Sequence, residues 1–302
     1  CRFCDSILRG KDGMRPTRLT EGNNWIVDLE RETIPPVNGT DVQITIDVDM
    51  QDIAQTALMK TLNKTDELHA GTVVLMEVAT GEIKAMVNLE KDGKGGFDET
   101  MNYAIGRKGE PGSVFKAATL TCMIEEQGLS IDDEVPSRVN WNYGKRIFTD
   151  HYLDNYGSTI TVRRGFEISS NNVFRMLAAR YYSADPDIFL NYLTNNLHIT
   201  KDFPFELKGF NHANIKSTAS RSWSPADLPQ IGMGYTVEIT QLHTLNFYNA
   251  LANDGVMVRP HLIRNYQKDG TVIQEFPPEV LATVCKPETA KMVREAMRGV
   301  VE

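Results

Sequence analysis

One stretch, GEPGSVFKAATLTCMIEEQG at residues 109–128, constrains the fold more than any other part of the chain. Residues 110–112 form a turn that breaks any preceding helix, and residues 114–124 are then apolar on nearly every side. A helix with this pattern is buried all round, so other elements must pack against each of its faces. Gly128 can adopt the left-handed conformation that ends a helix.

Two polar residues interrupt this apolar helix. Ser113 lies in its first turn and Lys116 follows three residues later, so the two side chains share a face. A neutral lysine amine can accept a hydroxyl proton, which makes the pair a candidate nucleophile and base. The alternative interpretation is a helix cap followed by a solvated lysine, because a Ser-x-x-Lys match is expected about once by chance in such a chain.

A catalytic Lys116 needs a strongly lowered pKa. A free lysine has a pKa of about 10.4, whereas a base that works near neutral pH needs a pKa of about 7 to 8. The helix N-terminus disfavours a cation by only about 0.3 to 1 kcal/mol. Burial must therefore supply most of the decrease, and the apolar body of the predicted helix can supply it.

Composition limits the size and the partners of the protein. A chain of 302 residues with 41% hydrophobic side chains is long enough for one large domain or two smaller ones. The net charge of −8 and the lack of a basic run argue against a nucleic-acid partner. No run of 18 apolar residues occurs, and residues 1–10 lack the regions of a signal peptide. Either the protein is cytosolic or such segments lie outside this sequence.

Metal and cofactor sites are also disfavoured. Cys1 and Cys4 form one CxxC motif, but it has no second pair for zinc, and no strand precedes it as in redox proteins. The six histidines lack the spacing of metal ligands. Gly232 and Gly234 lack the third glycine and the preceding strand of a dinucleotide site. We expect no metal and no cofactor.

Hydrophobic patterns predict a mixture of strands and helices. Residues 71–78 and 83–89 read as a hairpin in a sheet covered on both faces, because their apolar content is nearly continuous. Residues 129–158 are polar and aromatic without a period, which fits either the lining of a cleft or a long surface excursion. Further strands are predicted at 25–27, 41–46 and 256–263, a turn at 269–270, and helices at 47–62, 173–179, 186–197, 240–252 and 287–301.

Five stretches, in their order along the chain, resemble the class B penicillin-binding proteins, the D,D-transpeptidases that cross-link peptidoglycan. Ser-x-x-Lys followed by Ser-x-Asn is a specific pair of motifs in that context. The EPGSVFK form is more similar to the division-associated branch of the family than to the elongation branch. The matching stretches are residues 42–58, 71–87, 110–116, 168–174 and 231–260.

The resemblance implies a role for each of four residues. Ser113 is the nucleophile that becomes acylated, and Lys116 is its base. Ser169 relays a proton toward the leaving amine, and Asn171 holds the substrate backbone and the lysine.

The position of the second motif stays open by one residue. We favour Ser169 and Asn171 because Phe174 then follows the asparagine by three residues, as in the family pattern. The alternative is Ser170 with Asn172. Serine and asparagine before a helix are often only caps, so the residues by themselves do not decide.

The third motif of the family, Lys-Ser/Thr-Gly on a core strand, does not occur in this sequence. Residues 216–218 (KST) lack the glycine and precede the 231–260 stretch instead of following it. The resemblance therefore implies a fragment: residues 1–40 as the end of an N-terminal pedestal or linker, and residues 41–302 as a transpeptidase domain without its third-motif strand. Because that strand would supply one oxyanion N–H, we expect this chain alone to be weakly active or inactive.

The fold that the resemblance implies is α+β, an antiparallel sheet flanked by helices with a mostly helical second lobe, incomplete at the C-terminus. The implied reaction partners are peptidoglycan stem peptides and β-lactam antibiotics, with a glycosyltransferase and other cell-wall synthesis proteins as further partners. The implied location is the bacterial inner membrane, with the catalytic domain in the periplasm. Two alternatives remain, a hydrolase of the same superfamily (a D,D-carboxypeptidase or serine β-lactamase) and a non-catalytic scaffold or β-lactam sensor.

Overall fold

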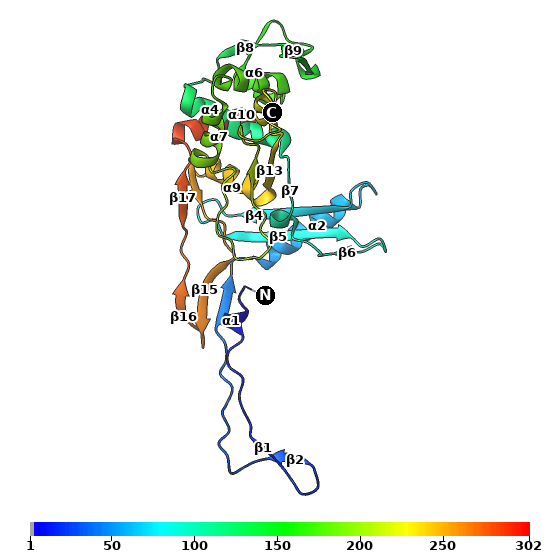
Figure 1. Cartoon of the computed structure of the whole chain (residues 1–302), viewed down its shortest axis with the longest axis vertical. Helices are drawn as coiled ribbons and strands as arrows, with labels where there is room; N and C mark the ends of the chain where they lie inside the picture. Colours follow the sequence, from blue (N-terminus) through cyan, green and yellow to red (C-terminus); the bar gives the residue numbers. More distant parts are fainter. Residues whose placement is uncertain (1–2) are drawn as a thin grey trace. The chain divides into compact units, whose positions relative to one another are not determined.

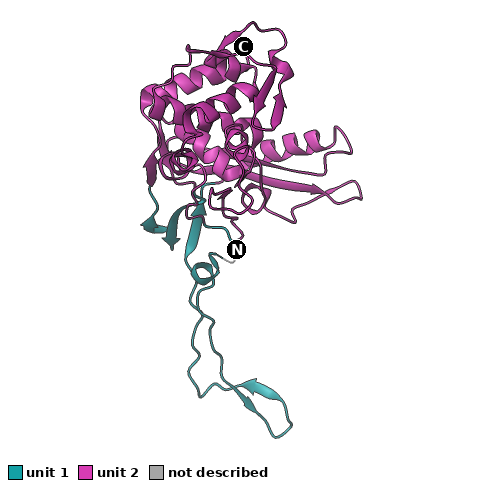
Figure 2. Ribbon diagram, turned by 45° about the horizontal axis from the view of Figure 1, so that its top comes forward, with its two compact units in different colours: residues 1–45, 206–208, 261–277 teal, residues 46–205, 209–260, 278–302 magenta. Residues whose placement is uncertain are grey.

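The computed structural model describes residues 3–302, and the chain divides into two compact units. Each unit combines segments that are distant in the sequence, as the two colours of Figure 2 show. Among the described residues, no helix is both long enough and apolar enough to cross a membrane. The first unit consists of residues 1–45, 206–208 and 261–277, and the second of residues 46–205, 209–260 and 278–302.

The first unit is built on a three-stranded antiparallel sheet in the order β16-β15-β3. Asp269 and Gly270 join β15 to β16 with φ angles of 52° and 77°, which confirms the predicted turn. A separate hairpin pairs β1 with β2, and β2 is the strand predicted at residues 25–27. The elements of this unit are α1 Asp5–Leu8, β1 Thr17–Leu19, β2 Trp25–Val27, β3 Asp41–Ile44, β15 Ile263–Lys268 and β16 Thr271–Glu275.

The single strand predicted at residues 256–263 is wrong. Two strands occur there: β14 (Val256–Val258) pairs with β17 (Val280–Thr283) in the second unit, and β15 begins at Ile263 in the first. Pro260 explains the break, because it lacks a backbone N–H for a ladder and restricts the residue before it.

The second unit is organised around α4 (Lys116–Gln127). Every residue of α4 from Lys116 to Ile124 is buried, which confirms the prediction of a helix that is covered all round. Gly128 ends the helix with a φ of 65°, as predicted. Helices α6 (Asn171–Tyr182) and α10 (Pro287–Arg298) pack against α4, and the three lie together in Figure 1.

A three-stranded antiparallel sheet, β4-β5-β6, forms another part of the second unit. One face of β5 is apolar, with Ala85, Val87 and Leu89 buried beneath α2. Asp47 caps α2 by accepting a hydrogen bond from the Met50 N–H at 2.9 Å. Residues of β4 are only half-buried or exposed, so the predicted cover on both faces of the sheet is partial. The bounds are α2 Val48–Leu62, β4 Ala70–Met76, β5 Ile83–Lys91 and β6 Phe97–Asp98.

The remaining elements of the second unit are short strands and helices around this core. The predicted helices at 186–197 and 240–252 are confirmed, the first as α7 continued by one π-helical turn. The remaining elements are α3 Tyr103–Gly106, β7 Lys108–Gly109, β8 Glu134–Pro136, β9 Asn140–Tyr143, β10 Arg146–Thr149, β11 Thr159–Thr161, α5 Val162–Glu167, α7 Pro186–Asn191, β12 Asn214–Ile215, α8 Asp227–Ile231, β13 Val237–Thr240 and α9 Gln241–Ala252.

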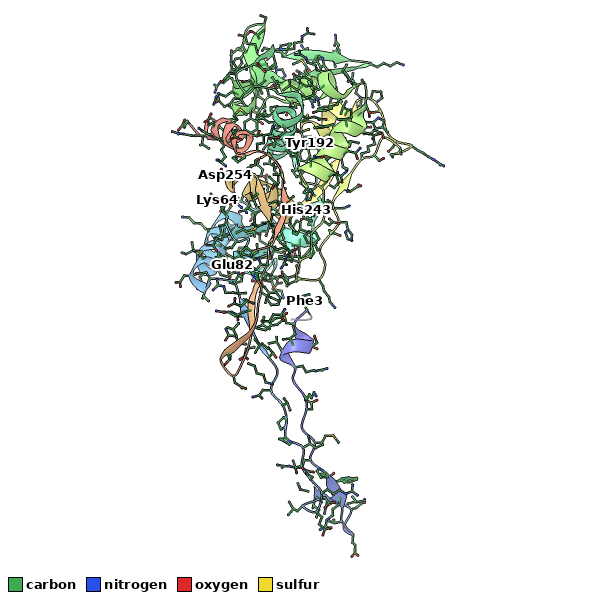
Figure 3. All side chains as sticks on the ribbon, turned by 90° about the vertical axis from the view of Figure 1, so that its left-hand side faces the viewer. Phe3, Lys64, Glu82, Tyr192, His243 and Asp254 are labelled. Atoms are coloured by element: carbon green, nitrogen blue, oxygen red, sulfur yellow. The ribbon has the colours of Figure 1, made fainter. Side chains whose placement is uncertain are left out.

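A buried histidine joins a long loop to α9. His243, labelled in Figure 3, is 2% exposed. Its Nδ1 lies 2.8 Å from the hydroxyl oxygen of Thr240. Its Nε2 lies 3.1 Å from a carboxylate oxygen of Asp202, so the loop that carries Asp202 is tied to the start of α9.

Candidate active site

The turn that carries Ser113 depends on a close approach of two backbones. Ser113 lies in a 3-10 turn, η1 (Gly112–Phe115), and its side chain is exposed. Gly112 has a φ of 59° and donates its N–H to the Gly234 carbonyl at 3.0 Å. Gly234 has a φ of 89°, and a Cβ there would lie 2.1 Å from the Gly112 carbonyl oxygen. Only glycine fits this position, which gives Gly234 a structural reason unrelated to nucleotide binding.

Lys116 is buried, with 1% of its surface exposed, yet its amine is surrounded by polar atoms. Four oxygen atoms lie within hydrogen-bond distance of Nζ. The Lys116 Nζ lies 3.2 Å from the Ser113 hydroxyl and 3.1 Å from the Ser169 hydroxyl. It also donates to the Asn171 side-chain carbonyl at 2.8 Å and to the Ser169 backbone carbonyl at 2.7 Å. An ammonium has only three protons for these four oxygens, whereas a neutral amine has a lone pair that can accept a hydroxyl proton.

Burial sets the protonation of this amine. It lowers the pKa of Lys116 to about 7, against a rise caused by Asp150 and with a smaller decrease caused by Arg175. The sequence-based expectation that burial would be the main cause is therefore confirmed. A lysine with this pKa has a large neutral fraction near neutral pH, as a general base requires.

Ser169 and Asn171 reach Lys116 because of the backbone shape of the turn before α6. Ser169 has a φ of 56°, in the left-handed region that a non-glycine residue seldom adopts. Asn171 is the first residue of α6, so its side chain projects from the start of the helix. The structure thus brings Ser113, Lys116, Ser169 and Asn171 together around one nitrogen atom.

Ser170 and Asn172, the alternative pair, are both fully buried and have other partners. Ser170 donates its hydroxyl proton to Asp150 at 2.7 Å and caps α6 by accepting from the Val173 N–H at 3.2 Å. The Asn172 amide nitrogen shares its two protons among three backbone carbonyls, those of Arg138, Val139 and Phe148. This pair therefore holds the turn in place and does not contact Lys116.

A pocket of about 280 Å³ opens beside the two serine hydroxyls and the lysine. Its other walls are largely apolar. Tyr248 lies on this wall and donates its hydroxyl to the Val114 carbonyl at 2.8 Å, and burial raises the pKa of Tyr248 to about 12. The lining residues are Ser113, Val114, Lys116, Phe166, Ser169, Tyr248, Met297, Val300 and Val301.

The aromatic segment at residues 129–158 lines a pocket and also exposes many of its residues, so it fits both predicted alternatives, the lining of a cleft and a surface excursion. Trp141 and Tyr143, whose ring centroids are 4.8 Å apart, line a second pocket of about 360 Å³ between the β9–β10 hairpin and α6. That pocket is larger than the one at Ser113 but contains none of the residues around Lys116. The chemistry of the side chains, and not the pocket volume, therefore marks the candidate site.

Two charged residues beside the site carried no signal in the sequence. Asp150 follows β10 within the aromatic segment and is 3% exposed. Arg175 lies on α6, donates to Gln230 at 3.1 Å, and holds its guanidinium 4.5 Å from the Phe148 ring. Both residues influence the pKa of Lys116. They lie outside any recognisable motif, and only the tertiary fold brings them to the lysine.

Other sequence candidates have different outcomes. Lys216, in the KST tripeptide that lacks the glycine of the third motif, forms an ion pair with Asp227 at 2.8 Å. Cys1 of the CxxC motif lies outside the described residues, while Cys4, Cys122 and Cys285 are free thiols. Within residues 3–302, no group of three histidine, cysteine, aspartate or glutamate side chains is arranged to hold a metal ion.

A family model and individual relatives all relate the chain to the penicillin-binding protein transpeptidases. A model of the penicillin-binding protein transpeptidase domain matches residues 71–302. The chain is 29% identical, over 325 aligned positions, to penicillin-binding protein PbpB of Mycolicibacterium smegmatis, and the match covers 99% of this chain and 46% of that protein. It is 26% identical to the probable peptidoglycan D,D-transpeptidase PenA of Neisseria meningitidis, with 99% and 49% covered.

A solved structure shares the fold. Penicillin-binding protein A of Mycobacterium tuberculosis, in a ceftriaxone acyl-enzyme complex, superposes with a TM-score of 0.73 at 19% identity, covering 88% of this chain and 63% of that one. The chain spans about half the length of the curated relatives it matches.

Proposed function

The chain belongs to the penicillin-binding protein transpeptidase domain family, and from this premise we propose that it is a serine acyltransferase that cross-links peptidoglycan stem peptides and is acylated by β-lactams. One observation carries the proposal more than any other. The buried Lys116 amine, whose pKa lies near 7, contacts the hydroxyls of Ser113 and Ser169 and the amide of Asn171. This arrangement supplies a nucleophile, a base and a proton relay within one hydrogen-bonded group.

The first half of the proposed reaction is acylation of Ser113. Neutral Lys116 accepts the hydroxyl proton while Oγ attacks the carbonyl carbon of the penultimate D-Ala of a D-Ala-D-Ala stem. The C–N bond to the terminal D-Ala breaks, and Ser169 passes a proton to the departing amine. An ester on Ser113 remains. Asn171 binds the substrate backbone and keeps the lysine in place.

The second half is transfer of the acyl group. An amine of a neighbouring stem attacks the ester carbonyl, the C–O bond to Ser113 breaks, and the proton of the attacking amine returns to Oγ through the same lysine. The exposed position of Ser113 at the mouth of the pocket, with Lys116 buried behind it, supports access of two large substrates in turn. A β-lactam would stop the cycle after the first half.

The cellular context is also part of the proposal. We propose that the complete protein is membrane-anchored with its catalytic domain in the periplasm, that residues 1–40 end a pedestal, and that residues 41–302 belong to the catalytic domain. A glycosyltransferase and other cell-wall synthesis proteins would be its partners, in the division-associated branch. The support is family membership and the likeness to relatives named PbpB and PenA.

The test is covalent labelling of the intact protein with a labelled penicillin, followed by peptide mapping. We expect one adduct, on Ser113, which is absent from a heat-denatured control and from Ser113→Ala. Labelling that persists in Ser113→Ala would overturn the proposal. Incubation with a stem pentapeptide and a D-amino acid then separates transfer from hydrolysis, because only a transpeptidase forms the exchanged peptide in preference to the shortened one.

A further inference from the structure

Asp150 binds the turn on both flanks of Asn171. One of its oxygens, Oδ2, accepts the Ser170 hydroxyl at 2.7 Å and the Asn172 backbone N–H at 2.8 Å. Its own backbone N–H donates to the Val139 carbonyl at 2.8 Å, so Asp150 is anchored to the hairpin side of the second unit. One side chain, 3% exposed, therefore holds the residue before Asn171 and the residue after it.

The turn needs such an anchor because its backbone is strained. Ser169 has a φ of 56°, a left-handed conformation that is unfavourable for a non-glycine residue and persists only when its surroundings enforce it. This conformation directs both the hydroxyl and the carbonyl of Ser169 to Nζ of Lys116. Two backbone hydrogen bonds, from the Ser169 N–H to the Phe166 carbonyl at 2.9 Å and from the Ser170 N–H to the Gly165 carbonyl at 2.8 Å, also hold the turn. Asp150 adds the side-chain anchor on its other flank, so its loss would weaken the constraint that keeps this geometry.

We propose that Asp150 is a positioning residue for acyl transfer: by binding Ser170 and Asn172 it holds Ser169 and Asn171 against Lys116. The inference rests on the proposed function of Ser113 and Lys116. Asp150 opposes the effect of burial on the lysine, while Arg175 acts in the same direction as burial. Asp150 thus influences both the position and the charge of the base without contacting the substrate.

The experiment compares Asp150→Asn with Asp154→Asn in the intact protein. Asp154 lies four residues away on the same segment, is exposed and hydrogen-bonds to His151, so its replacement removes a carboxylate that does not bind the turn. We expect penicillin acylation of Asp150→Asn to be about 10-fold slower, because an uncharged amide oxygen holds the Ser170 hydroxyl and the Asn172 N–H more weakly than a carboxylate, and loosened catalytic groups lose rate. The rise of the acylation rate around pH 7 should also move to lower pH, because loss of the negative charge lowers the pKa of Lys116. Asp154→Asn should match the wild type.

A second variant separates position from charge. Ser170→Ala removes one of the two hydrogen bonds to Asp150 but keeps the carboxylate, so acylation should slow while the midpoint of the pH profile stays in place. An NMR titration of the lysine Cε signals, with the Lys116 signal identified by its loss in Lys116→Met, reports the same pKa without any acylation.

The outcomes are distinguishable. If Asp150→Asn acylates within about twofold of the wild type, or slows with no movement of the Lys116 pKa, the inference is overturned. If the wild type forms no adduct on Ser113 but Asp150→Asn still lowers the Lys116 pKa in the titration, the proposed function fails while the action of Asp150 on the lysine stands.

Discussion

Residues 169–172 contain two serine–asparagine pairs that are offset by one residue and have different partners. Ser169 and Asn171 place oxygen atoms 3.1 and 2.8 Å from Nζ of Lys116. Ser170 and Asn172 have the same residue types, yet they bind Asp150 and the backbone of the hairpin. The first pair, which we call the reactive side, surrounds an amine that burial has made easy to deprotonate. The second pair, the supporting side, satisfies its polar groups within the protein. The same two residue types therefore contact the lysine in one pair and stabilise the turn in the other, because their hydrogen-bond partners differ.

The largest effect should come from the amine at the centre of the reactive side. We predict that Lys116→Ala slows penicillin acylation of Ser113 by about 100- to 10,000-fold, the range typical for loss of a general base. The rate of the wild type should rise with pH through about 7, as Lys116 loses its proton, and that rise should disappear in the variant. Stopped-flow acylation between pH 5.5 and 8.5 measures both. A variant rate close to wild type would show that Lys116 is only a neighbour of the nucleophile.

The apolar run in α4 predicted a buried helix, and a catalytic lysine on such a helix needs burial to lower its pKa. The roles of Ser169 and Asn171 followed from the family resemblance and not from the local pattern. The choice between Ser169 and Ser170 could not be made with equal certainty, since both are followed two residues later by asparagine. What separates them is the left-handed backbone of Ser169 and the distant partner Asp150, and neither leaves a local pattern.

The failures of prediction have the same physical origin. Asp150 lies in a segment without hydrophobic period, and its importance arises from contacts 20 and 22 residues further along the chain. The strand predicted across residues 256–263 was judged by its apolar side chains, although Pro260 divides it between two sheets. Propensity describes what a segment can form, whereas its partners decide where it stops.

A smaller effect separates the two sides directly. We predict that Asn172→Ala lowers the free energy of unfolding by about 2 to 4 kcal/mol, because buried carbonyls of the hairpin lose their donor. Asn171→Ala should lower it by less than about 1 kcal/mol, since Asn171 is only partly buried, while slowing acylation about 10-fold or more. Urea unfolding and acylation rates on both variants provide the comparison. If the two variants lose stability and rate in the same proportion, the distinction between the sides is wrong.

The smallest effect concerns what the buried lysine does to stability. The pKa of Lys116 is lowered in the folded protein from 10.5 to about 7, so between these values the unfolded chain binds more protons than the folded one. Stability contributed by this group must then rise with pH across that window, and below about pH 7 the folded state carries the full penalty of a buried cation. We predict that the wild type gains about 2 kcal/mol relative to Lys116→Met between pH 7 and pH 9. Because the other titrating groups are shared, their contributions cancel in the difference. Urea unfolding of both proteins at the two pH values measures it, and a difference that stays constant with pH would mean that Lys116 keeps its proton despite the oxygen atoms and apolar residues around it.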